Sequence, residues 1–266
     1  MNKTIFKKEV KLFQRNKNKK TVVMQVLPHL NSGGLVSGAI EIAEAIQNAG
    51  GISLVVTAGG YRLHELNRTG SLVELLPVDT KNIFKIKSNI KKIMQLIISY
   101  NVSLVHVRSR APAWSCYWAC KKLKLPFITT FHGTYGYKSF LKKQYNRIMV
   151  SGTKTIAISD FISKHIKDIY NVTKNVEVIS RGVDANIFSP SSVSAERLIG
   201  LSKLFRLDSI QSVILMPGRL TRWKGHKYAL KALSIINRPD IRMLFVGDIQ
   251  KKHAYKKELL NYAKKM

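Results

Sequence analysis

The sequence predicts an α/β fold in which helices cover a mainly parallel β-sheet. Short runs rich in β-branched residues alternate with longer stretches of helical periodicity, which is typical of successive βαβ units. The 266 residues are 45% hydrophobic, which is enough to bury a sizeable core. The alternation resumes after a polar stretch in the last third of the chain, so we expect two α/β units.

Seven apolar runs of the first unit are predicted strands, because each is short, β-branched and bounded by turn residues. They are Val22–Leu27, Ile52–Thr57, Leu72–Leu76, Ser103–Val107, Phe127–Phe131, Thr155–Ile158 and Val176–Ile179. Helices are expected between them. The clearest helix spans Ile83–Tyr100, where isoleucines recur at helical spacing with lysines among them, as in a helix that covers a sheet.

The chain is expected to divide into four segments. These are a basic leader (1–20), a first doubly wound domain (21–180), an interdomain connection (181–210) and a second doubly wound domain (211–266). The connection contains Gly182, Pro190 and several serines, which suits a linker. The second unit has only two predicted strands, Val213–Met216 and Met243–Val246, whereas such a domain usually has about five or six. We therefore expect the second domain to be incomplete.

The chain carries 45 lysines and arginines against 15 aspartates and glutamates, a formal net charge of +30. This charge indicates a nucleic acid, a membrane surface or a phosphorylated substrate as partner, unless the lysines simply cover solvated helix faces. No RNP-like, KH-like or zinc-finger pattern occurs, which argues against nucleic acid. The leader mixes lysines with Ile5, Phe6, Val10 and Phe13, which fits either an anionic membrane surface or a disordered tail.

Two cysteines, Cys116 and Cys120, lie four residues apart in a predicted helix, so a disulfide between them is geometrically awkward. Reduced core cysteines fit a cytoplasmic setting. No apolar run reaches the roughly 18 residues of a membrane-spanning helix, and Thr21–Leu27 fits a first strand better than a signal peptide. We expect a cytoplasmic protein, with peripheral contact to the inner face of the cytoplasmic membrane as an option.

Glycines and a histidine follow two of the predicted strands. Gly33 and Gly34 lead into a helix, where adjacent glycines allow close approach of a ligand and free N–H groups attract phosphate. A tight turn explains them equally well, and the spacing does not match G-x-G-x-x-G. His132 follows the fifth strand, where it can face a ligand as a neutral donor or as a cation, although a lone histidine is usually structural.

The segment 217–225, PGRLTRWKG, joins a strand to a helix in the second unit. Its three cations and two glycines suit a diphosphate, because arginine grips phosphate oxygens bidentately and lysine supplies a point charge. A solvated basic loop is the alternative. Phosphate binding is favoured because the loop follows the carboxyl end of a strand, where open α/β sheets bind ligands.

The motifs SGG, HVRSR, TTFHGTY, AISDFI, VISRGVD, PGRLTRWKG and LFVGD follow one another in an order that resembles family 4 of the retaining glycosyltransferases. The resemblance extends from about Thr21 to Asp248. It implies a GT-B-like fold, with a complete N-terminal Rossmann-like domain on the acceptor side followed by a partial Rossmann-like domain that binds the donor.

By this resemblance, Gly33 and Gly34 lie near the transferred sugar and its phosphate, and His132 contacts the sugar near the reacting centre. Arg219 and Lys224 bind the donor diphosphate. The implied reaction moves a sugar from a nucleotide-sugar donor to a cell-envelope glycan or lipid-linked acceptor, such as a lipopolysaccharide-core sugar, with retention. No metal and no cofactor beyond the donor are expected, since no Asp-x-Asp motif occurs.

One departure from the family concerns its Glu-x7-Glu segment, whose two glutamates approach the donor sugar and bind the nucleotide ribose. This sequence has no counterpart, and Glu258 is the only carboxylate after Asp248. The alternative to an active transferase is therefore a truncated, non-catalytic remnant, or half of a split enzyme that binds acceptor or partner and lacks a C-terminal fragment.

Overall fold

The protein is described by a computed structural model over residues 20–207, 212–249 and 253–266. The chain divides into two compact units, Met1–Gly182 and Val183–Met266. The basic leader expected over residues 1–20 lies outside the described residues except for Lys20.

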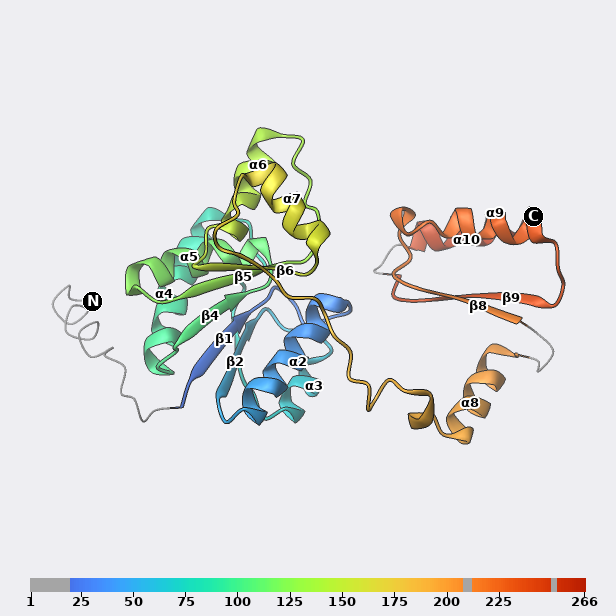
Figure 1. Cartoon of the computed structure of the whole chain (residues 1–266), viewed down its shortest axis with the longest axis horizontal. Coiled ribbons are helices and arrows are strands. Elements are labelled where there is room, and N and C mark those ends of the chain that lie inside the picture. Colours follow the sequence, from blue (N-terminus) through green and yellow to red (C-terminus); the bar gives the residue numbers. More distant parts are fainter. Residues whose placement is uncertain (1–19, 208–211, 250–252) are drawn as a thin grey trace. The chain divides into compact units, whose positions relative to one another are not determined.

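A wholly parallel sheet of seven strands forms the centre of the first unit (Figure 1). Its order is β3-β2-β1-β4-β5-β6-β7. The strands are β1 (Val22–Val26), β2 (Ile52–Thr57), β3 (Leu72–Leu75), β4 (Leu104–Val107), β5 (Phe127–Phe131), β6 (Lys154–Ala157) and β7 (Val176–Val178). The predicted α/β fold and its seven strands are confirmed, with ends that differ by one residue at most.

Strand order reverses between β1 and β4. In β1, Val23 is paired with Ser53 of β2 on one side and with Leu104 of β4 on the other. The chain therefore builds outward from β1 in one direction and then from β4 in the other. Such a topological switch point is where open α/β sheets bind ligands, beyond the carboxyl ends of the strands.

Helices cover both faces of this sheet. They are α2 (Gly34–Asn48), α3 (Leu63–Arg68), α4 (Ile83–Ser99), α5 (Arg110–Leu123), α6 (Phe140–Arg147) and α7 (Asp160–Tyr170), with a 3-10 turn at Ile148–Val150. One face packs α2 and α3 around Val55 and Leu66. The other face packs α4, α5 and α7 into a larger core with Met24 and Phe131. Alternate strand residues thus serve opposite cores, as the two-residue repeat of a strand requires.

The two cysteines lie where the helical spacing puts them, on the buried face of α5. Cys116 and Cys120 are both free thiols in the larger core. Burial raises the pKa of Cys120 to about 12, so its thiol stays protonated and unreactive at neutral pH.

The second unit holds a two-stranded parallel sheet with helices beside it. Its elements are a 3-10 turn (Pro190–Ser192), α8 (Ala195–Phe205), β8 (Ser212–Pro217), a 3-10 turn (Arg222–Lys224), α9 (His226–Ile236), β9 (Ile241–Val246) and α10 (His253–Lys264). A small core forms around Leu220, Tyr255 and Leu259. Within the described residues no third strand joins β8 and β9. Apolar side chains of β8 are exposed, Leu215 to 57%.

One helix lies where the sequence interpretation expected only a connection. Residues 181–210 include α8, whose first turn is capped by the Ser194 hydroxyl accepting from the Arg197 N–H at 3.3 Å. Serines and Pro190 resemble a linker in sequence, yet the same residue types start helices. The connection is therefore partly helical.

No helix in the described ranges combines the length and the apolar character that crossing a bilayer requires.

Candidate functional site

The predicted site residues of the first unit follow β1 and β5, which lie on either side of β4 in the sheet. Gly33 and Gly34 come after β1, and His132 follows β5 directly. Because the strands are parallel, their carboxyl ends share one edge of the sheet, here called the carboxyl edge. The structure also brings two arginines to this edge, Arg108 after β4 and Arg181 after β7.

The start of α2 is formed by glycines that make room for Arg181. Gly33 has a φ of 118°, a conformation that side chains rarely adopt, and as the N-cap residue it has no side chain to cap the helix. A Cβ on Gly34 would lie 2.6 Å from Nη1 of Arg181, and one on Gly38 would clash with Nη2. The guanidinium therefore lies against the first turn of α2. A cation meets the positive end of the helix dipole there, so an anion between them is favoured.

Arg108 provides a second cation at the carboxyl edge. Its Nε donates to Oε1 of Gln25 at 2.9 Å, and Nε2 of Gln25 donates to the Ala39 carbonyl of α2 at 3.0 Å. Only 4% of Arg108 is exposed, and its Nη2 has no hydrogen-bond partner among the described residues. Burial, and then the charge of Arg181, lowers the pKa of Arg108 to about 10, while the more weakly acting Glu41 opposes the shift. Arg108 thus stays positive at neutral pH.

His132 is a neutral group beside these cations. Burial lowers its pKa to about 3, with further contributions from the charges of Arg108 and Arg181. The imidazole is therefore uncharged at physiological pH, which favours the neutral donor of the two forms that the sequence left open. Its Nε2 is buried and finds no partner in the described part of the chain. A neutral imidazole nitrogen can donate to or accept from a hydroxyl group.

The loop that follows His132 is held by α5 and α6. The guanidinium carbon of Arg110 lies 4.2 Å from the centre of the Tyr135 ring, and its Nη1 donates to Oδ1 of Asn146 at 2.9 Å. Nδ2 of Asn146 in turn donates to the Gly136 carbonyl at 3.0 Å. These contacts fix the backbone after β5, so His132 is presented from a supported loop.

In the second unit, the loop after β8 carries Arg219 and Lys224. The N–H of Gly218 donates to the Val246 carbonyl at 2.8 Å, and a Cβ on Gly247 would collide with the Gly218 carbonyl. The ends of β8 and β9 are therefore drawn tightly together beneath the loop. Nζ of Lys224 lies 4.5 Å from the centre of the Trp223 ring, a cation–π distance.

The third cation of that loop, Arg222, is committed to an ion pair. Its Nη1 donates to Oε1 of Glu258 in α10 at 2.8 Å and its Nη2 to Oε2 at 2.5 Å, while Lys227 of α9 pairs with the same carboxylate. The Arg222 hydrogen bond, followed by that of Lys227, lowers the pKa of Glu258. Glu258 therefore ties α10 to the loop and α9. Nowhere in the described ranges do three His, Cys, Asp or Glu side chains gather to hold a metal ion.

Arg108 and Arg181 belong to the motifs HVRSR and VISRGVD, but no role was predicted for them from the sequence. Their position could have indicated one, because both follow predicted strands at the edge of the sheet where ligands bind. A second signal was Gln25, a polar residue inside an otherwise apolar strand, because a buried amide needs polar partners. The convergence of Arg181 on α2 joins residues far apart in the chain and had no local signal.

Comparison with known proteins identifies two family regions. The profile described as Glycosyltransferase Family 4 matches residues 32–187, and the profile described as Glycosyl transferases group 1 matches residues 203–265. No curated protein sequence matches the chain.

Several solved structures share the fold. A glycosyltransferase from Rickettsia africae is 35% identical, with a TM-score of 0.80 over 92% of this chain and 65% of its own. HepE from Anabaena, solved with UDP-glucose, is 18% identical, with a TM-score of 0.78 over 92% of this chain and 65% of its own. WaaG, a glycosyltransferase involved in lipopolysaccharide biosynthesis, is 13% identical, with a TM-score of 0.64 over 91% of this chain and 68% of its own. The chain thus spans 65% to 68% of the length of these structures.

Proposed function

The chain belongs to glycosyltransferase family 4, and we propose that it transfers a sugar from a nucleotide-sugar donor to a cell-envelope glycan or lipid-linked acceptor, with retention of configuration. The observation that carries the proposal is the cluster at the carboxyl edge of the first unit. There, the Arg181 guanidinium and the start of α2 favour an anion, and neutral His132 lies beside Arg108.

The charges at this edge suit the chemistry of sugar transfer. In the reaction, the acceptor hydroxyl oxygen bonds to the anomeric carbon on the face that the diphosphate leaves, the bond from that carbon to the diphosphate oxygen breaks, and the hydroxyl proton passes to the departing diphosphate. Negative charge grows on the departing diphosphate, so fixed cations that face it lower the barrier most effectively where water is excluded. The buried, still positive Arg108 and the guanidinium of Arg181 are groups of this kind. The orphan Nε2 of His132 suits a hydrogen bond to a hydroxyl of the transferred sugar.

In the second unit, the loop that carries Arg219 and Lys224 suits the binding of a nucleoside diphosphate. Their loop follows the carboxyl end of β8 and ends at the N-terminus of α9, which offers backbone N–H groups to phosphate oxygens. Arg222 is held by Glu258 and takes no part. The proposal needs no metal, because arginine, lysine and helix N-termini offset the diphosphate charge.

The proposed donor and acceptor are supported by the similarity of fold and by the residues of the site. HepE was solved with UDP-glucose, which supports a nucleotide sugar as donor. WaaG takes part in lipopolysaccharide biosynthesis, which supports an acceptor of the cell envelope.

The experiment is a transfer assay on the purified chain with a panel of nucleotide sugars and a lipid-linked sugar fraction from a bacterial envelope. We expect one donor to be consumed, with release of the nucleoside diphosphate and a mass increase of one sugar on the acceptor. Arg181→Gln and His132→Gln should each lower the rate at least about tenfold, as loss of a group that contacts the transition state does. Arg147→Gln, which changes an exposed arginine on α6, is the matched control.

Equal rates for the wild type, Arg181→Gln and His132→Gln would show that the carboxyl edge does not carry the reaction. Donor binding without any transfer would instead favour the alternative of a chain that binds without turnover.

A further inference from the structure

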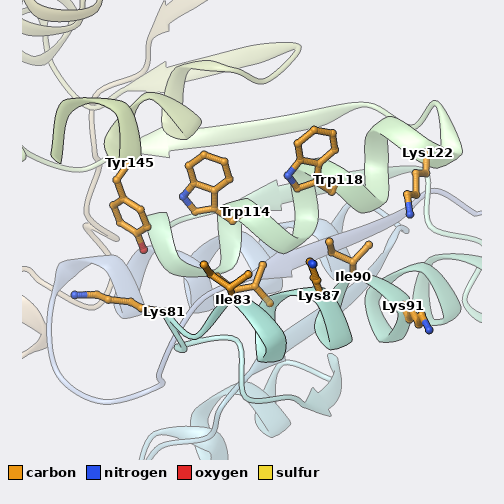
Figure 2. A pocket seen from close by; sticks show the side chains of 10 residues that line it. Lys81, Ile83, Lys87, Ile90, Lys91, Trp114, Trp118, Lys122 and Tyr145 are labelled. Atoms are coloured by element: carbon orange, nitrogen blue, oxygen red, sulfur yellow. The ribbon is translucent and has the colours of Figure 1, made fainter. Parts of the chain in front are cut away.

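An apolar groove lies between α4 and α5 of the first unit, outside the residues assigned to sugar transfer. Its volume is about 790 Å³, within the range of sites that hold a drug-sized ligand. Figure 2 shows Trp114 and Trp118 along α5, Ile83, Lys87 and Ile90 along α4, and Tyr145 at one end. The full lining is Lys81, Ile83, Ile86, Lys87, Ile90, Lys91, Trp114, Trp118, Lys122 and Tyr145. Isoleucine and aromatic side chains therefore form its walls, lysines are its only charged groups, and none of its residues is acidic.

The segment around the groove carries basic side chains and no acidic ones. Between Asp79 and Asp160 the chain contains no aspartate or glutamate, and it contains 15 lysines and arginines. Half of the formal net charge of +30 thus falls in the stretch that forms α4, α5 and α6. Lysines and arginines are about as frequent here as in the rest of the chain, so the excess charge of this stretch comes from its lack of acidic residues. The segment presents a positive field to one class of partner.

Large apolar side chains are exposed within this basic segment. Ile83 and Phe84 in the first turn of α4 are 67% and 81% exposed. Leu141 of α6 is 77% exposed and shares a helix face with Tyr145, four residues on. Exposed apolar side chains on a basic surface, with tryptophan and tyrosine beside them, are typical of a protein face that lies in the membrane interface.

We infer that the α4–α5 groove docks on a membrane surface that carries anionic phospholipids. The hydrocarbon of a lipid fits the apolar wall of Ile86 and Ile90. Lys87, Lys91 and Lys122 then lie against the phosphate headgroups.

This docking also has a consequence for the site at the carboxyl edge. α4 follows β3 and α5 follows β4 directly, so both helices begin at that edge. Ile83 and Trp114, near these starts, bring the lipid surface close to the same end of the sheet as Arg108 and His132. An acceptor anchored in the membrane would then reach the site without leaving the bilayer, although docking itself does not depend on transfer activity.

Vesicle co-sedimentation of the whole chain tests the inference. We expect binding to phosphatidylcholine vesicles that contain about one third phosphatidylglycerol, little binding to phosphatidylcholine alone, and release at about 0.5 M salt. Lys87→Glu with Lys91→Glu should lower partitioning at least about 30-fold. Lys167→Glu with Lys174→Glu removes the same charge from exposed lysines on and after α7, and should change partitioning less than about threefold. Equal effects of the two pairs, or no effect of either, would overturn the proposal.

Quenching by vesicles with brominated acyl chains tests the apolar part. Trp118→Phe should reduce the quenching of tryptophan fluorescence, and Trp223→Phe, which removes an exposed tryptophan of the second unit, should not. Binding without quenching of Trp118 would show that hydrocarbon does not enter the groove. The proposal would be wrong if the chain did not bind vesicles but bound duplex or single-stranded nucleic acid, and if replacing Lys87 and Lys91 abolished that binding. The groove would then be a nucleic-acid site.

Discussion

Replacing Gly34 by alanine tests whether the absence of a side chain at this position leaves the space that the Arg181 guanidinium needs. The new Cβ would lie 2.6 Å from Nη1, closer than any side-chain carbon tolerates, so the guanidinium must move. It is the far end of a flexible side chain, and its displacement is therefore cheap for the fold. Alanine is also a better helix residue than glycine, so we expect the free energy of unfolding to stay within about 1 kcal/mol of the wild type.

Ligand binding should suffer far more than stability. A charge-assisted hydrogen bond to phosphate contributes about 1.5–3 kcal/mol, so losing the Arg181 contact should weaken donor binding about 10- to 150-fold. Calorimetric titration with the donor identified by the transfer assay measures this loss. Gly200→Ala is the matched control, because Gly200 is also helical and an added Cβ meets nothing within 4 Å.

A double-mutant cycle separates the two possible causes of weaker binding. If the alanine acts through Arg181, Gly34→Ala should have no further effect in the Arg181→Ala background. Additive losses would instead show that the methyl group obstructs the ligand directly. An unchanged affinity in Gly34→Ala would refute the idea that the guanidinium at the start of α2 binds an anion.

Three other perturbations have defined outcomes. Arg219→Ala and Lys224→Ala should each weaken nucleoside diphosphate binding by about 1–3 kcal/mol in calorimetry, whereas Arg222→Ala should not; equal losses for all three would mark a merely basic loop. The pKa of His132 is lowered to about 3, so the folded state binds fewer protons than the unfolded state, and stability falls as pH drops from 6.5 toward 3. At pH 5.5 the free energy of unfolding is about 1.4 kcal/mol lower for this reason, and His132→Gln should remove this loss from the pH dependence of the urea transition. The same pH dependence in the wild type and in His132→Gln would contradict the burial of the imidazole. Leu215→Thr on exposed β8 should change thermal stability by less than about 0.5 kcal/mol, and a larger loss would show that this face is covered.

Local patterns account for most of the fold that the sequence predicted. The strands were predictable because each is a short β-branched run, and the helix at Ile83 begins where Asn82 accepts hydrogen bonds from Phe84 and Lys85 N–H groups. α8 was missed because Pro190 and several serines before it are typical of a linker, although its own apolar residues recur at helical spacing.

The candidate site was predictable only in part. Gly33, Gly34 and His132 follow strands, and a parallel sheet brings all strand ends of one kind to one edge. The approach of Arg181 to α2 depends on the order of strands in the sheet, which no local pattern contains. The charge state of His132 likewise follows from burial and from two distant arginines, so it required the folded structure.

The most direct test of the central claim is calorimetric titration of the purified chain with a panel of nucleotide sugars. We predict that at least one of them binds, and that Arg181→Gln weakens this binding at least about tenfold while the control Arg147→Gln leaves it unchanged. A panel in which no nucleotide sugar binds, or one that binds equally to both variants, would contradict the account.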